Sequence, residues 1–111
     1  KWQGKRILAS QTVLGATQSL GGFTLDRSLM LPMRYSAGFM LGGTPVGIYG
    51  RNTQHAYGHL GYSNIICWAD PQRDIAVSLM NTGKPVISPH ITALFKLVDA
   101  ISVTCQPAVD R

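Results

Sequence analysis

The sequence of 111 residues predicts an α+β fold in which an antiparallel sheet is flanked by helices. Two apolar runs, residues 65–69 and 75–80, have the length of strands and are joined by only five residues. A connection this short fits an antiparallel hairpin, because parallel strands need a crossover of about a dozen residues or more. Apolar residues then recur at helical spacing between Ile91 and Ile101. Strands grouped ahead of a terminal helix are typical of the α+β class.

The strands can be placed from composition and turn residues. Both central runs are continuously apolar, a pattern typical of strands covered on both faces. Asp70 followed by Pro71 begins a β-turn between them. Residues 34–41 also predict a strand, 44–54 a short strand or loop, and 23–32 a loop with some extended structure.

Two helices are expected. Ser10 is a good N-cap, residues 11–19 carry Val13, Leu14 and Thr17 at helical spacing, and two glycines follow at 21 and 22. For the second helix, Ser88 can cap and Pro89 fits the first turn, so we expect a helix over residues 89–103.

Composition limits the classes of function. Charged residues make up only 14% of the chain, against about 25% in a typical soluble domain, which indicates that the chain buries much of itself against another segment. The ten cations give a net charge of +5 but are scattered, so no nucleic-acid surface is predicted. No apolar stretch approaches the roughly 18 residues of a membrane span. The chain begins with Lys1 and has no visible signal peptide, so we expect it to be part of a longer polypeptide and leave its localisation open.

The stretch from Gly58 to Asn64, which leads into an apolar strand, is the candidate site. Gly61 lacks the Cβ that would block close approach of a substrate to the strand backbone. His59 and His55 are four residues apart, a spacing that could bind zinc on a helix. The flanking glycines argue against a helix here, so no metal and no cofactor are predicted.

The two cysteines and Trp68 are expected to have structural roles and no catalytic one. Cys67 and Cys105 are expected to be free, with Cys67 a small buried apolar residue, although a disulfide between them stays open. Trp68 lies in an apolar run and is expected in the core.

An ordered set of motifs resembles the C-terminal part of serine β-lactamase-like proteins, which include class C β-lactamases, related esterases and penicillin-binding proteins. The set is Tyr-Ser-Ala-Gly-Phe from position 35, Gly-His-Leu-Gly from 58, Trp-Ala-Asp-Pro from 68 and Ser-Leu-Met-Asn-Thr-Gly from 78. The resemblance implies that residues 1–111 are the C-terminal segment of a β-lactamase/transpeptidase-like domain. The nucleophile is absent, because no serine here has a lysine three residues on, as the S-x-x-K motif requires.

The resemblance also assigns roles to three residues. His59, Leu60 and Gly61 fall where the family has its Lys-Thr-Gly triplet, so His59 would replace the lysine and Gly61 would permit close approach. The backbone N–H of Tyr62 would be one of two oxyanion-hole donors. Leu60 in place of threonine removes a hydroxyl that β-lactamases use toward the substrate carboxylate. Tyr62-Ser63-Asn64 also matches the family's Tyr-x-Asn motif, but it overlaps the third motif instead of preceding it.

The function expected from this resemblance is a serine hydrolase, most of all a carboxylesterase acting on a small ester or amide, with this chain contributing the oxyanion-hole strand. The remaining N-terminal part of the protein, in the same or a separate chain, would be its partner. Three alternatives stay open: a β-lactamase or D-Ala-D-Ala peptidase, a non-catalytic peptide- or peptidoglycan-binding member of the fold, and a stand-alone basic α+β binding module.

Overall fold

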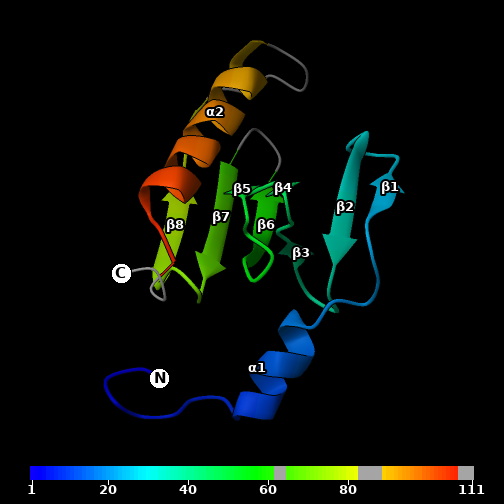
Figure 1. Ribbon diagram of the computed structural model, residues 1–111. Helices are drawn as coiled ribbons and strands as arrows, with labels where there is room; N and C mark the ends of the chain where they lie inside the picture. Colours follow the sequence, from blue (N-terminus) through cyan, green and yellow to red (C-terminus); the bar gives the residue numbers. More distant parts are fainter. Residues whose placement is uncertain (62–64, 83–88, 108–111) are drawn as a thin grey trace.

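A computed structural model describes residues 1–61, 65–82 and 89–107 and has the predicted α+β architecture, with a six-stranded antiparallel sheet and two helices (Figure 1). The strand order in the sheet is β1-β2-β3-β6-β7-β8, and β4 and β5 form a separate small hairpin. The elements are α1 (Ser10–Thr17), β1 (Thr24–Asp26), β2 (Leu31–Tyr35), β3 (Met40–Leu41), β4 (Val46–Gly47), β5 (Gly50–Arg51), β6 (Tyr57–Gly61), β7 (Ile65–Asp70), β8 (Ile75–Leu79) and α2 (Pro89–Thr104).

The predicted hairpin of the two apolar runs is confirmed as β7 and β8. They pair antiparallel, with Cys67 opposite Ser78. The turn closes through a hydrogen bond from the Arg73 N–H to the Asp70 carbonyl (3.2 Å), and the Asp70 carboxylate accepts the Gln72 N–H (3.0 Å). Aspartate at the first position of a β-turn makes this side-chain contact readily, which is why the turn could be located from the sequence.

The prediction of one strand over residues 34–41 is wrong, because a tight turn divides this segment into the end of β2 and the short strand β3. The Ser36 N–H donates to the Phe39 carbonyl (3.0 Å), and the Ser36 hydroxyl accepts the Phe39 N–H (2.9 Å). A serine side chain that satisfies a nearby N–H stabilises a turn in place of an extended strand. Residues 23–32, expected as a loop, supply β1 and the start of β2.

The core lies on one face of the sheet, beneath α2. Tyr49, at the tip of the β4–β5 hairpin, is fully buried, stacks on Trp68 with ring centroids 5.4 Å apart and donates to the Met40 carbonyl (3.0 Å). Its burial raises the pKa of the Tyr49 phenol well above the usual range. Val98 of α2 is also fully buried against this cluster. The core position expected for Trp68 is confirmed, as is the second helix, although Ser88 lies outside the described residues.

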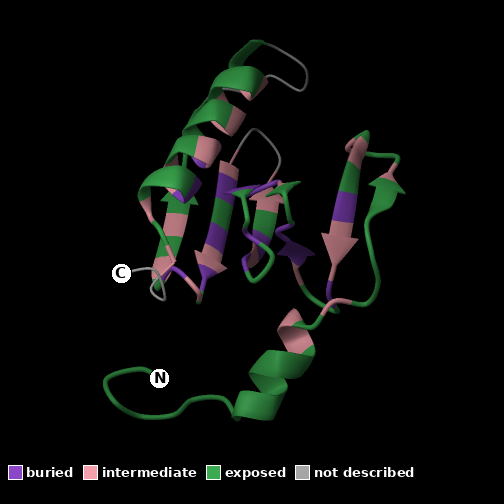
Figure 2. Ribbon diagram, in the orientation of Figure 1, coloured by how far each residue is buried: buried purple, intermediate pink, exposed green. Residues whose placement is uncertain are grey.

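The expectation that the central strands are covered on both faces is not met by the described residues. Burial alternates along β7, as the colours of this strand show in Figure 2. Ile66 and Trp68 are buried with Val98 of α2 in the core, and Cys67 between them is exposed. Ala76 and Ser78 of β8 are exposed on the same side as Cys67. Cys67 is therefore not the buried residue that the sequence predicted, because its strand position points away from α2.

Helix α1 also departs from prediction at both ends. Its N-cap is Ala9, without a side-chain cap, while the Ser10 hydroxyl accepts a hydrogen bond from the Arg6 guanidinium. The helix ends at Thr17, ahead of the two glycines, and the Gln18 N–H closes the last turn on the Leu14 carbonyl (2.8 Å). None of its residues is buried, so tertiary packing within the described chain does not fix its ends.

The β1–β2 hairpin carries a pH-sensitive contact. The Tyr35 hydroxyl donates to the Asp26 carboxylate, which also accepts the N–H groups of Ser28 (2.8 Å) and Leu29 (2.9 Å). The Tyr35 hydrogen bond is the main cause that lowers the pKa of Asp26, and the same bond raises the pKa of Tyr35 to about 12.

We expect this hairpin to be most stable between the ordinary pKa values of the two groups, 3.8 for the carboxyl and 10.0 for the phenol. The stability that the Asp26 carboxylate contributes to the hairpin is lost as pH falls through its lowered pKa. The stability that the Tyr35 phenol contributes is lost as pH rises from 10.0 through about 12. Hydrogen exchange at Ser28 and Leu29 measures the effect. In Tyr35→Phe the alkaline loss should disappear, and an unchanged alkaline response in this variant would contradict the assignment.

Candidate functional site

The candidate site lies at the end of β6, where the strand runs past its neighbour β3. On one side β6 pairs with β7 along its whole length, from Tyr57 opposite Ala69 to Gly61 opposite Ile65. On the other side it pairs with β3 only at Tyr57 and Gly58. Within the described part of the chain, residues 59–61 therefore form a local strand edge inside a larger sheet.

The backbone groups on this edge can be assigned from the hydrogen bonds. The Ala56 carbonyl accepts the Gly42 N–H (2.9 Å), and two steps beyond Gly58 the Leu60 N–H donates to the Met40 sulfur (3.3 Å). Alternate residues of β6 thus direct their backbone groups toward the β3 side. A thioether is a weak acceptor, so on this edge the Leu60 N–H has a weak partner in place of a strand carbonyl, and the Leu60 carbonyl is contacted by a side chain, Nδ1 of His59 (2.8 Å).

The ring of His59 is exposed on the face of the sheet opposite α2. Its Nδ1 lies 2.8 Å from the carbonyl oxygen of Leu60, which can only accept, so Nδ1 carries the proton in this contact. In the tautomer with the proton on Nδ1, the lone pair lies on Nε2. Cys67 lies directly opposite His59 on β7, and Ser78 opposite Cys67 on β8, so His59 stands at one end of a row of small polar side chains.

Gly61 is the last residue of β6. A Cβ built there would lie 3.3 Å from the Ile65 carbonyl oxygen, which is tight, and 3.5 and 3.9 Å from Cβ and Cγ2 of the Ile65 side chain, which is ordinary contact. The fold therefore imposes little requirement for glycine at this position. Tyr62, predicted to supply an oxyanion donor, lies outside the described residues.

Leu60 does not face the candidate site. Its side chain is half-buried and packs against the core cluster beneath α2, on the face opposite His59. A threonine hydroxyl at this position would point toward the same core. The resemblance implied that leucine in place of threonine removes a hydroxyl from the site, but in this structure the replacement changes no side chain on the exposed face.

The surroundings of His59 are apolar and neutral on the β3 side. The rings of Phe39 and Tyr57 pack with centroids 5.2 Å apart, and Tyr57 lies two residues before His59 on the same face of β6. A neutral substrate group is the chemistry that such a wall fits.

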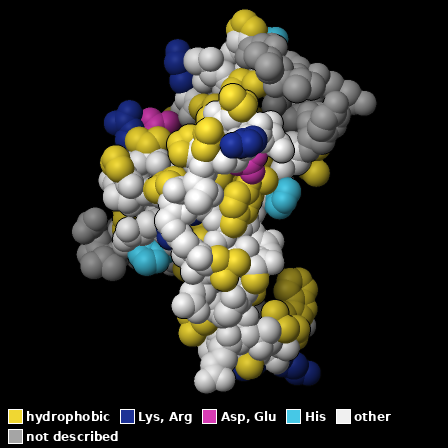
Figure 3. All heavy atoms as spheres, turned by 90° about the vertical axis from the view of Figure 1, so that its right-hand side faces the viewer, with side chains coloured by type: hydrophobic (Ala, Val, Ile, Leu, Met, Phe, Trp, Pro, Cys, Tyr) yellow, Lys and Arg dark blue, Asp and Glu magenta, His cyan; other side chains and the backbone are white. Residues whose placement is uncertain are grey.

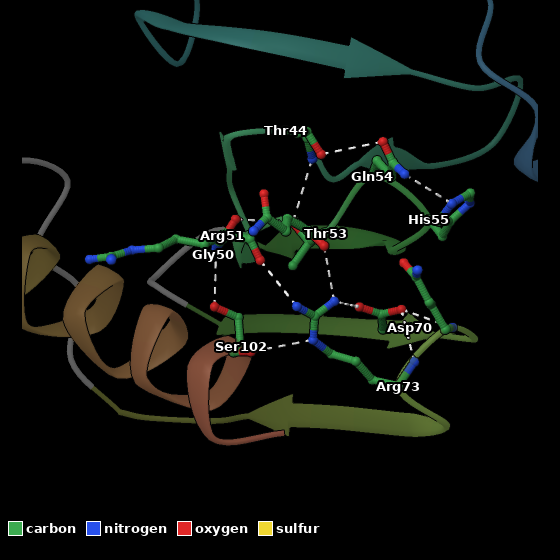
Figure 4. A network of polar contacts seen from close by, with 12 residues as sticks. Thr44, Gly50, Arg51, Thr53, Gln54, His55, Asp70, Arg73 and Ser102 are labelled. Atoms are coloured by element: carbon green, nitrogen blue, oxygen red, sulfur yellow. Dashed lines mark hydrogen bonds and ion pairs between the residues drawn. The ribbon is translucent and has the colours of Figure 1, made fainter. Parts of the chain in front are cut away.

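The sequence analysis missed a buried cation that holds the sheet to α2. Arg73 is 3% exposed, and its guanidinium lies 2.8 Å from the Asp70 carboxylate (Figure 4). It also donates to the carbonyls of Asn52 (3.0 Å), Arg51 (3.2 Å) and Ser102 (3.3 Å). The Ser102 hydroxyl in turn accepts the Arg51 N–H (3.0 Å). The sequence predicted a β-turn here, and nothing local indicates that its arginine is buried.

No group of three or more His, Cys, Asp or Glu side chains that could hold a metal occurs in the described ranges. His55, the second histidine of the possible zinc pair, contacts Gln54 through its Nε2 (3.2 Å), and β6 is a strand and not a helix. Cys67 and Cys105 are both free. Neither described helix is long and apolar enough to cross a membrane.

Comparison with known proteins gives one distant relationship. No family model and no solved structure matches the chain. Over 88 residues the chain is 31% identical to the esterase/β-lactamase LipL of Mycobacterium tuberculosis. The match covers 79% of this chain and 19% of LipL, so the chain spans about a fifth of that relative's length. The similarity and the antiparallel α+β fold together support a relationship to β-lactamase-like proteins.

Proposed function

We propose that this chain forms one wall of the active site of a β-lactamase-like serine hydrolase, and that the complete protein is a carboxylesterase. The observation that carries the proposal is the end of β6, where pairing with β3 stops at Gly58, beside the exposed ring of His59. The likeness to a protein named esterase/β-lactamase supports the class of reaction.

In the proposed reaction, a serine outside these 111 residues attacks the ester carbonyl. The tetrahedral oxyanion accepts hydrogen bonds from the serine's own N–H and from the N–H of Tyr62, and the alcohol then leaves. Water hydrolyses the acyl-enzyme and releases the acid. The proposal requires Tyr62 to continue the backbone alternation of β6, in which Leu60 directs its N–H toward the β3 side. His59 would hydrogen-bond the reacting groups through Nε2, since Nδ1 is held by the Leu60 carbonyl.

An ester is preferred over a β-lactam as substrate because the described neighbours of His59 are neutral. They are the opposite residue Cys67, Ser78 beyond it, and the Phe39–Tyr57 pair. A β-lactam carries a carboxylate that favours a cationic partner, whereas a simple ester carries none.

The exposed face of the sheet is proposed to be covered by the remaining N-terminal part of the same protein, in the same or a separate chain. This face holds His59 and Cys67 together with Ala76 and Ser78, and all four are exposed. A cover there would enclose the edge of β6 and exclude water from it, which strengthens electrostatic stabilisation of an oxyanion.

Labelling with a fluorophosphonate probe tests the proposed function. The complete protein should be labelled at one serine and should hydrolyse p-nitrophenyl acetate, whereas this chain alone should do neither. Absence of labelling and of turnover in the complete protein would contradict a serine hydrolase and favour a binding role. Labelling of one of the eight serines within this chain would contradict the assignment of the nucleophile to another segment.

A further inference from the structure

Met40 lies where β6 loses its partner strand on the β3 side. It is the first residue of β3, pairs with Gly58 of β6 and is only 9% exposed. In this register, a longer β3 would set Gly38 opposite Leu60. Residues 36–39 form a tight turn instead, closed by hydrogen bonds within the turn. The strand β3 therefore ends before it reaches Leu60.

The side chain of Met40 takes the place of the missing strand residue. Its sulfur accepts the Leu60 N–H at 3.3 Å. A thioether is a weak acceptor, but an N–H left without any partner away from water costs more than a weak hydrogen bond. Because a peptide group is planar, a partner for this N–H fixes the orientation of the whole peptide between His59 and Leu60.

The Met40 sulfur is itself held in a defined position by the core. The Met40 carbonyl accepts the hydroxyl of Tyr49 (3.0 Å), and Tyr49 is fully buried and stacked on Trp68 of β7. Met40 belongs to the core cluster beneath α2, and Leu60 packs against the same cluster. Since protein interiors are close-packed, this arrangement restricts movement of the sulfur relative to β6.

The next peptide along β6 carries the partner of the His59 ring. Nδ1 of His59 lies 2.8 Å from the Leu60 carbonyl oxygen. The Leu60 N–H and carbonyl flank one Cα, so Leu60 connects the buried sulfur to the exposed imidazole. All three histidines of the chain are exposed, and Figure 3 shows histidine side chains at the molecular surface. A contact in the core thereby bears on the orientation of a ring at the surface.

We propose that Met40 is a positioning residue of the hydrolase, which orients the His59 ring through the backbone of Leu60. The inference rests on the proposed esterase function and adds a residue that acts on the rate without contact to the substrate. While the sulfur holds the Leu60 N–H, Nδ1 keeps its carbonyl partner and Nε2 serves the reacting groups. Without the sulfur, the Leu60 backbone turns more freely and the ring loses its fixed orientation.

The first test is Met40→Leu in the complete protein. This change removes the sulfur and keeps an apolar side chain of similar volume, which cores tolerate well. It should lower kcat for p-nitrophenyl acetate by about threefold to tenfold, the rate equivalent of one ordinary hydrogen bond. KM should be unchanged, because Met40 is buried and orients groups that act in the transition state.

Met33→Leu is the matched control. Met33 is 1% exposed and lies in the same core cluster, and within the described ranges no hydrogen bond reaches its sulfur. This variant should keep the wild-type kcat. Met40→Gln restores an acceptor, its amide oxygen, at nearly the same side-chain length and should recover part of the lost rate. An equal loss in Met33→Leu, or no recovery in a folded Met40→Gln, would overturn the positioning role.

A spectroscopic test needs no variant of Met40. In the complete protein labelled with ¹⁵N-histidine, the ring of His59 should carry its proton on Nδ1 at a pH of about 8, where an ordinary imidazole is neutral. His59→Gln assigns the signals. The Leu60 amide should exchange slowly with solvent, and faster in Met40→Leu. A proton on Nε2 of the wild-type ring would overturn the proposal, whether or not Met40→Leu folds.

The outcomes separate this role from the proposed function. An unchanged kcat in a folded Met40→Leu, in a protein that hydrolyses esters, overturns the role of Met40 and leaves the esterase function intact. A complete protein that is not labelled by fluorophosphonate and hydrolyses no ester overturns the esterase function, and with it any effect of Met40 on catalysis. Melting temperatures show whether each variant is folded.

Discussion

Replacement of Arg73 by alanine is expected to destabilise the complete protein by about 3–5 kcal/mol, the usual cost of removing one partner of a buried ion pair. The Arg73 and Asp70 side chains are 4% and 1% exposed. Loss of the guanidinium would leave the Asp70 carboxylate buried without its cation. It would also leave the carbonyls of Asn52, Arg51 and Ser102 without this donor. Urea denaturation followed by circular dichroism measures the loss.

Arg51→Ala is the matched control for that experiment. Arg51 pairs with Asp99 at 3.0 Å, but its side chain is 63% exposed, and solvent screens the pair. Removal of an exposed ion pair costs at most about 1 kcal/mol. A loss in Arg73→Ala no larger than that in Arg51→Ala would mean that Arg73 does not hold the β7–β8 turn to α2.

Gly61→Val is expected to lower kcat/KM of the complete protein by at least about 10²-fold, the scale of one lost oxyanion-hole donor. The branched side chain would crowd the acyl group at the edge of β6 and disturb the adjacent N–H of Tyr62. The folded protein should be retained, since among the described residues a Cβ at Gly61 meets only Ile65, with its carbonyl oxygen at 3.3 Å and its Cβ and Cγ2 at 3.5 and 3.9 Å. The test measures kcat/KM with p-nitrophenyl acetate, and the melting temperature shows that the variant is folded.

Gly58→Ala provides the contrasting control within the same strand. A Cβ at Gly58 would overlap the Cys67 carbonyl oxygen, so this change should reduce stability and yield of folded protein. Gly61→Ala should be intermediate in rate and close to wild type in stability. Unchanged kinetics in Gly61→Val would remove this strand from the active site, and with it the main argument for the proposed function.

Features set by residues close together in the chain could be predicted from the sequence. The β7–β8 hairpin follows from two apolar runs and an Asp-Pro turn whose side chain closes on its own backbone. Helix α2 follows from a proline start and a single apolar stripe that includes the buried Val98. The strand position of His59 and Gly61 also followed, because glycines at this spacing disfavour a helix.

Only the tertiary structure decided which side of each element is buried and which distant residues meet. The strand predicted over residues 34–41 is instead a β2–β3 hairpin, because the Ser36 hydroxyl accepts the Phe39 N–H in a turn. The Leu60 side chain faces the core and not the candidate site. Arg73 is buried because Asn52 and Ser102, 21 and 29 residues away, supply its acceptors. Cys67 is exposed because its face of the sheet has no cover among the described residues. A local sequence pattern encodes the periodicity of helices and strands and the residues of turns. Which side chains are buried, and which polar groups bond to each other, depends on long-range packing that neighbouring residues do not specify.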